Sequence, residues 1–122
     1  MIGSVRLGNK RKSSPHQPEP GDVVIAIDRP NVLCNPYPIT EKRTRARAIE
    51  MFRKDLDNDV RLRRGPRYAA LCEIVERVLA GDDVILMCWC CDSAGTACHG
   101  DVIKEIVERL VRPPALKLER RP

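Results

Sequence analysis

The sequence has few aromatic residues: one tryptophan, two tyrosines and one phenylalanine in 122 residues. Its core must therefore be mostly aliphatic. A surface that stacks bases on aromatic rings is not indicated, and no docking motif for nucleic acid is present. The chain also lacks any long apolar run, so we expect neither a signal peptide nor a membrane-spanning helix.

Without a secretion signal, we expect a cytoplasmic location. In a reducing compartment, clustered cysteines are more often metal ligands or reactive thiols than disulfides, and the chain has six of them. The 22 basic and 17 acidic residues give a net charge of +5, a moderate excess that favours phosphate-bearing partners without requiring them. The length fits a single domain with one core.

Three apolar stretches predict strands: Ser4 to Leu7, Asp22 to Asp28, and Val84 to Trp89. The second is a nearly unbroken β-branched run, which is typical of a strand covered on both faces in a parallel sheet. The connection from Gly8 to Gly21 is long for a compact domain. It is either a functional flap or a poorly ordered segment.

The spacing of apolar residues predicts two helices after the second strand and one helix after the third. The first helix is expected from Glu41 to about Asn58 with Thr40 as its N-cap, and the second from Pro66 until Gly81 ends it. The last should open near His99 and stop at Pro113-Pro114. Between the second strand and the first helix, Arg29 to Thr40 contains three prolines and forms a stiff loop.

These elements predict an α/β protein of β-β-α-α-β-α order, a small single-domain sandwich with a short, mostly parallel sheet flanked by helices. Residues 1–21 supply a strand and a flexible loop, 22–112 the α/β core, and 113–122 a charged tail. In such sheets the carboxyl ends of parallel strands share one edge, where ligands bind. We therefore expect the loops after the second and third strands to form one cleft.

The segment after the third strand gathers cysteines that could bind a metal. Cys88, Cys90, Cys98 and His99 supply the donor set of a Cys3His zinc site, with Cys91 as a spare donor. The spacing departs from the usual zinc pattern, because adjacent residues such as Cys98 and His99 do not easily bind one tetrahedral ion. An iron–sulfur cluster is a further alternative.

The same segment also fits an activated thiol. If Cys98 lies just ahead of a helix, the amides and positive dipole at the helix start stabilise its thiolate. His99 would then transfer a proton, and Asp101 would orient it or act as a second base. The alternatives are an ordinary capping hydrogen bond for His99 and a favourable first-turn charge for Asp101. This helix start could instead hold a phosphate or carboxylate.

Other polar residues are expected at the same edge, where Arg29 would neutralise charge. Arg45 either points inward or covers apolar surface with its stem. Asn35 either binds a ligand through its amide or is simply a turn residue. Trp89 is expected to pack in the core, with stacking on a ring as the alternative. The candidate ligand-binding residues are Arg29, Asn35, Tyr37, Arg45, Cys88, Trp89, Cys90 and Gly100.

Three stretches, Ile27 to Ile39, Ala48 to Leu56 and Leu86 to Ile103, carry a resemblance to a known family. The chain resembles domain of unknown function family 4326, a small domain of phages and bacteria with a Gly-Asn-Pro-aromatic turn and a CWC…CHGDV segment. Here Cys34 stands where the family has glycine, and the spacer inside the second motif is longer and lacks proline. The resemblance implies a phage-type protein of the host cytoplasm and a shared cleft, without an established activity. That cleft would be built from Arg29, Asn35, Cys88, Cys90, Cys98, His99 and Asp101.

The resulting hypothesis is a protein that binds, and in its stronger form processes, a nucleotide-like or other anionic small molecule at this cleft. The nucleotide part draws on a looser likeness to small α/β domains with a strand-end cysteine and a helix-start Cys-His. Two alternatives stay open: a zinc-stabilised interaction module with structural cysteines, and a basic accessory protein that binds nucleic acid through its Arg-rich helix.

Overall fold

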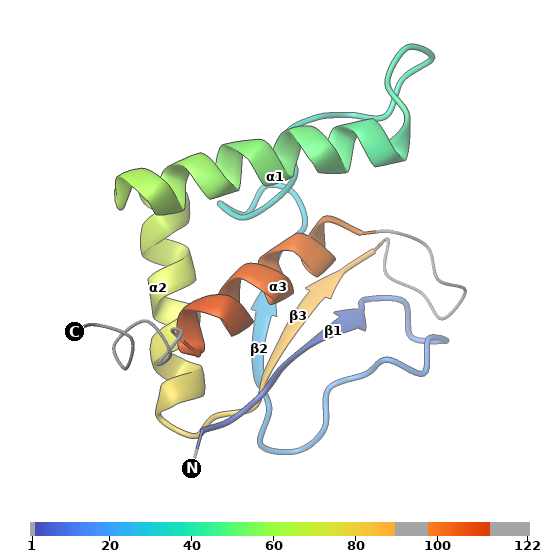
Figure 1. The fold of residues 1–122 in the computed structure, drawn as a ribbon. Coiled ribbons are helices and arrows are strands. Elements are labelled where there is room, and N and C mark those ends of the chain that lie inside the picture. The colour runs from blue at the N-terminus through green and yellow to red at the C-terminus, as the bar shows by residue number, and fades with distance from the viewer. Residues whose placement is uncertain (1, 90–97, 113–122) are drawn as a thin grey trace, which may run out of the picture.

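The computed structural model describes residues 2–89 and 98–112. Three strands and three helices follow one another in the predicted β-β-α-α-β-α order (Figure 1), which confirms the α/β class. Predictions for Cys90, for Cys91 and for residues 113–122 lie outside the described residues. The elements are β1 Val5–Asn9, β2 Val23–Ala26, α1 Arg45–Leu62, α2 Pro66–Leu79, β3 Val84–Cys88 and α3 His99–Val111.

The sheet is parallel, as expected, and its strand order is β1-β3-β2. The central strand β3 is buried along its whole length. The expectation that the run from Asp22 to Asp28 is covered on both faces is wrong, because β2 is an edge strand and Val24 is 54% exposed. All three strands end at the same edge, which brings Asn9, Ile27 and Cys88 together.

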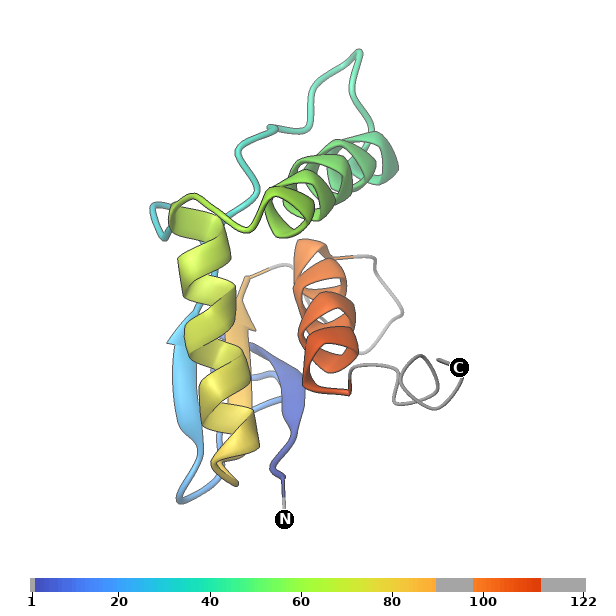
Figure 2. The ribbon, with the colours of Figure 1, turned by 60° about the vertical axis from the view of Figure 1, so that its left-hand side comes forward.

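Helices α2 and α3 pack on one face of the sheet, and α1 packs against these two helices near the ends of the strands (Figure 2). Val84, Leu86 and Cys88 of β3 join one hydrophobic core with the helices. Burial of these aliphatic side chains stabilises the fold. Helix α3 buries Val102, Ile103, Ile106 and Val107 in this core, while Leu110 is only partly buried. Lys54, Arg61 and Arg109 are exposed on the outer sides of α1 and α3.

The opposite face is covered by the segment between β1 and β2 instead of by a helix in the described part of the chain. Ile85 and Met87 of β3 point to this face and are nevertheless buried. Arg6, on the same face, pairs with Asp22 and donates to the carbonyl oxygen of Gln17, which holds the segment against the sheet. The Gln17 amide in turn donates to the carbonyl oxygens of Asn9, Arg11 and Ser14, so this connection has a defined structure.

Helix α1 starts four residues later than expected. Thr44 is its N-cap, and its hydroxyl accepts the backbone N–H of Arg47 at 3.1 Å. The assignment of Thr40 as N-cap is wrong, because Thr40 pairs with Arg43 in a short antiparallel bridge. The physical reason is that residues 41–44 carry no apolar side chain that could anchor a helical turn to the core. None of the helices in the described ranges is long and apolar enough to cross a membrane.

Candidate functional site

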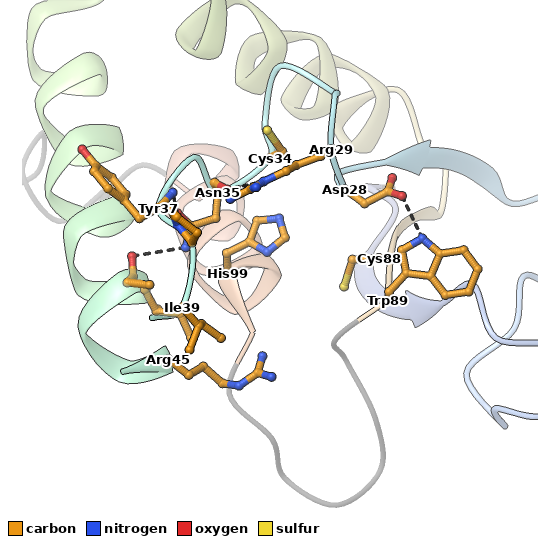
Figure 3. Close-up of a pocket in the computed structure, with 13 residues that line it drawn as sticks. Asp28, Arg29, Cys34, Asn35, Tyr37, Ile39, Arg45, Cys88, Trp89 and His99 are labelled. Carbon is orange, nitrogen blue, oxygen red and sulfur yellow. Dashed lines mark hydrogen bonds between the residues drawn. The ribbon is translucent and has the colours of Figure 1, made fainter. Parts of the chain in front are cut away.

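A cleft of about 390 Å³ lies where β2 and β3 end. Its walls are the loop that follows β2, the first turns of α1 and the start of α3 (Figure 3). The Asn-Pro-Tyr-Pro turn and the end of β3 thus face one another across a single space. The lining residues are Asp28, Arg29, Cys34, Asn35, Tyr37, Pro38, Ile39, Arg45, Ala48, Ile49, Cys88, Trp89 and His99.

His99 is the first residue of α3 and is 8% exposed. Its Nε2 lies 2.8 Å from the carbonyl oxygen of Ile27. A carbonyl can only accept, so Nε2 carries the proton, and Nδ1 of the neutral ring is an acceptor. The Phe52 ring and the imidazole pack edge to face, with centroids 5.4 Å apart. The end of β2 and helix α1 therefore fix both the tautomer and the orientation of His99.

Cys98 is the N-cap of α3, and its Sγ lies 3.2 Å from Sγ of Cys88. It also accepts the backbone N–H of Gly100 at 3.3 Å and lies 3.9 Å from Nδ1 of His99. The predicted Cys98-His99 pair thus lies next to Cys88, the last residue of β3. Cys88 is one of the residues that line the cleft, and Cys98 is not.

Asp101 closes the cap of α3. Its Oδ2 accepts the backbone N–H of Cys98 at 3.0 Å, which is the favourable first-turn role that the sequence left open. Gly100 is buried, and a Cβ there would lie 2.9 Å from side-chain carbons of Ile27 and Leu7. Neither residue lines the cleft; both let α3 start close to the strand ends.

In the described ranges, no three residues among His, Cys, Asp and Glu are placed so that they could hold a metal ion together. Cys88, Cys98 and His99 do lie together, but Nε2 of His99 is bound to a carbonyl, so only Nδ1 could reach a metal. Cys90 belongs to the residues outside those ranges. The Cys3His zinc site therefore stays a prediction.

Trp89 lies at the rim of the cleft and is 54% exposed. Its expected packing in the core is wrong, because the residue follows the last paired position of β3, beyond the area that the helices cover. Its indole N–H donates to Oδ2 of Asp28 at 3.0 Å (Figure 3). The exposed ring makes stacking on a ligand the remaining interpretation.

Asp28 is a cleft residue that the sequence analysis missed. The Lys10 ammonium lies 2.8 Å from its carboxylate. Hydrogen bonding to Lys10, supported by the Trp89 indole, holds the pKa of Asp28 below its usual range. A carboxylate directly after an apolar strand, at the carboxyl edge of a parallel sheet, was the signal that could have identified it.

Titration of Asp28 should be visible in the fluorescence of the single tryptophan. Because the folded pKa of Asp28 is lowered, its ion pair is intact above the usual aspartate range and is lost as the pH falls through the lowered value. We expect the emission of Trp89 to change with a midpoint below that range, and Lys10→Met to move the midpoint upward. A midpoint unaffected by Lys10→Met would contradict this assignment.

Arg29 and Asn35 hold the loop after β2 in shape. The Arg29 guanidinium donates to the backbone oxygen of Asn35 through Nε at 3.3 Å and a terminal nitrogen at 3.2 Å. The Asn35 amide donates to the carbonyl oxygen of Ala48 and accepts the backbone N–H of Tyr37. Asn35 therefore acts as a turn residue that ties the loop to α1. A guanidinium has five donors, so Arg29 can also bind a ligand.

Tyr37 and Arg45 point in different directions in Figure 3. The Tyr37 hydroxyl points away from the cleft and donates to Asp55, which raises the pKa of Tyr37. Arg43 lies over its ring, 5.5 Å from the centroid. Arg45, in the first turn of α1, extends along the cleft and lines it, which supports the inward orientation.

The family model described as Domain of unknown function (DUF4326) matches residues 9–109. This range contains all of the described cleft residues and all three helices except Leu110 and Val111 at the end of α3. No curated protein and no solved structure shows a match. Because the match extends over far more than half of the chain, the protein belongs to the DUF4326 family of domains of unknown function.

Proposed function

We propose that the cleft binds an anionic small molecule of the nucleotide type, with its phosphate near Arg45 and Arg29 and its ring near Trp89. One observation carries the proposal: two arginines and an exposed tryptophan line a cleft at the carboxyl edge of a parallel sheet. This edge is the usual ligand position in open α/β sheets.

The cleft has the size and lining of a small-molecule site. Its volume of about 390 Å³ falls within the range of roughly 300–1,000 Å³ typical of ligand pockets. Pro38, Ile39 and Ile49 give it an apolar wall, and Ile39 is 56% exposed. An apolar wall beside a few polar groups suits a flat heterocycle, which would bury the exposed surface of Ile39 and Trp89.

The charges favour an anion. Among the described residues that line the cleft, Asp28 is the carboxylate, and Lys10 lies against it. Two of the same described lining residues, Arg29 and Arg45, are cationic. The first turns of α1 and α3 open beside it, and their amide dipoles add to the attraction for a phosphate.

Any chemical step on the ligand would fall to groups that line the cleft. His99 offers Nδ1 as a proton acceptor, Cys88 a thiol and Asp28 a carboxylate. Cys98 and Asp101 stand behind them, so their part in such a step would be to position α3 and His99. Binding is the property that we propose for direct measurement.

The single tryptophan reports on binding without a label. We expect nucleoside monophosphates to change Trp89 emission in a saturable manner, and the matching nucleosides to bind more weakly because they lack the phosphate. Arg45→Gln removes a charge-assisted contact, each worth about 1.5–3 kcal/mol, and should weaken nucleotide binding by roughly 10- to 100-fold. The matched control is Arg47→Gln. Arg47 is exposed on the same helix, where it pairs with Glu50, and its replacement should leave the affinity unchanged.

Three outcomes would reject the proposal. One is the absence of a saturable signal with the four common nucleoside monophosphates. Another is equal affinity for nucleotide and nucleoside, which would mean that the phosphate does not contribute to binding. The third is binding of oligonucleotides that falls steeply with salt and is weakened equally by Arg45→Gln and Arg47→Gln, which would indicate a nucleic-acid surface on α1.

A further inference from the structure

We propose that Cys88 and Cys98 form a redox-active dithiol, which a hydroperoxide entering the cleft converts into a disulfide. The two sulfur atoms lie 3.2 Å apart, and each residue is 1% exposed. Cys88 ends β3 and Cys98 caps α3, so two regular elements hold the pair in place. The inference concerns the oxidation of these side chains and does not depend on a bound nucleotide.

The geometry is that of two thiols ready to join. A disulfide bond is about 2.05 Å long, so the two sulfur atoms must approach by roughly 1 Å. Cys98 lies in an extended conformation, with φ −138° and ψ 145°, outside the first turn of α3. Its side chain can therefore turn toward Cys88 without a change in the helix.

The two thiols differ in environment, and this difference determines which of them reacts first with the oxidant. Gly100 donates its backbone N–H to Sγ of Cys98, which holds this sulfur at the start of α3. Sγ of Cys88 lies within hydrogen-bond distance of Sγ of Cys98, and either thiol can donate to the other. Cys88 lines the cleft and Cys98 does not, so the oxidant meets Cys88 first.

The reaction balances with one hydroperoxide. The sulfur of Cys88 attacks the O–O bond, an S–O bond forms, and the leaving alkoxide takes the thiol proton to become an alcohol. Cys98 then attacks the sulfur of the resulting sulfenic acid. The S–S bond forms, the S–O bond breaks, and the hydroxide leaves with the proton of Cys98 as water. The two thiols together give up two electrons, which reduce the peroxide.

Two further cysteines provide matched controls. Cys34 lines the same cleft, but Figure 3 shows it on a different side from Cys88. Cys72 belongs to α2 and is partly buried there. Neither should join a disulfide with Cys88 or Cys98. Replacing either by serine should therefore leave the oxidation of the pair unchanged.

The test uses the full chain with Cys90→Ser and Cys91→Ser, which leaves four of the six cysteines. After stoichiometric hydrogen peroxide, denaturation and alkylation, mass spectrometry should show two alkylated thiols instead of four, and dithiothreitol should restore four. Adding Cys88→Ser or Cys98→Ser should abolish the paired loss, whereas adding Cys72→Ser should leave it intact. Chymotryptic cleavage after Trp89 separates the two cysteines, so only a disulfide keeps both fragments in one mass.

The same mapping on the unaltered chain covers the case in which the double variant does not fold. Four alkylated thiols after oxidation of the double variant, or six after oxidation of the unaltered chain, would overturn the proposal. A disulfide that joins Cys88 or Cys98 to any other cysteine would also overturn it. Near-stoichiometric zinc in the purified protein, lost on Cys88→Ser, would also overturn it, because both thiols would then be metal ligands.

Discussion

Replacing Phe52 by alanine is expected to lower the free energy of unfolding by about 3–5 kcal/mol, the usual cost of removing a buried aromatic ring from a packed core. Phe52 is fully buried in the hydrophobic core and is the only phenylalanine in the chain. Its ring joins α1 to α3 through the contact with His99. Urea denaturation followed by circular dichroism measures the loss.

The control for Phe52 is Lys54→Ala on the exposed side of α1. A surface substitution of this kind should change the free energy of unfolding by no more than about 0.5 kcal/mol. If Phe52→Ala cost less than about 1 kcal/mol, α1 would not be packed on the core as described, and the wall of the cleft that it forms would have to be placed elsewhere.

Replacing His99 by alanine is expected to cost about 2–3 kcal/mol. The substitution leaves the buried carbonyl of Ile27 without the donor that lies 2.8 Å away, and such an unsatisfied group costs about 1–3 kcal/mol. It also removes the edge contact with Phe52. Thermal or urea unfolding measures the effect.

A second variant separates the hydrogen bond from packing at this position. His99→Gln keeps an N–H donor near the place of Nε2 and should recover part of the lost stability, whereas His99→Leu keeps volume without a donor. If leucine were as stable as the wild type and glutamine were not, the bond to Ile27 would contribute nothing, and the tautomer assigned to His99 would lose its basis.

The architecture could be predicted because each element has its own local signal. Apolar runs gave the strands, helical spacing gave the helices, and the order of the elements favoured a parallel sheet. From that sheet the shared edge followed directly, since the loops after β2 and β3 must leave on the same side. The start of α1 was misplaced because Thr40 and Thr44 are both acceptable caps, and only tertiary packing decides between them.

The roles of single residues depended on contacts between distant parts of the chain. Trp89 looked like a core residue from its neighbours in sequence, yet its partner is Asp28, 61 residues away. The pairing of Asp28 with Lys10 could not be predicted, because the two residues are 18 positions apart in the sequence. Asn35 and Asp101 were proposed for ligand chemistry, and their side chains hold the backbone of the loop and of α3.

The short segment between β1 and β2 covers one face of the sheet in this small domain. About a dozen residues, held in place by the hydrogen bonds of the Gln17 amide, cover the face of β3 that carries Ile85 and Met87. Larger α/β proteins cover this face of the sheet with further helices. The same segment begins at Lys10, whose ammonium group forms an ion pair with Asp28, and Asp28 also accepts the indole N–H of Trp89. Through this ion pair, the segment that covers the back of the sheet also contacts the rim of the cleft, and a displacement of the segment would leave the charge of Asp28 without that of Lys10.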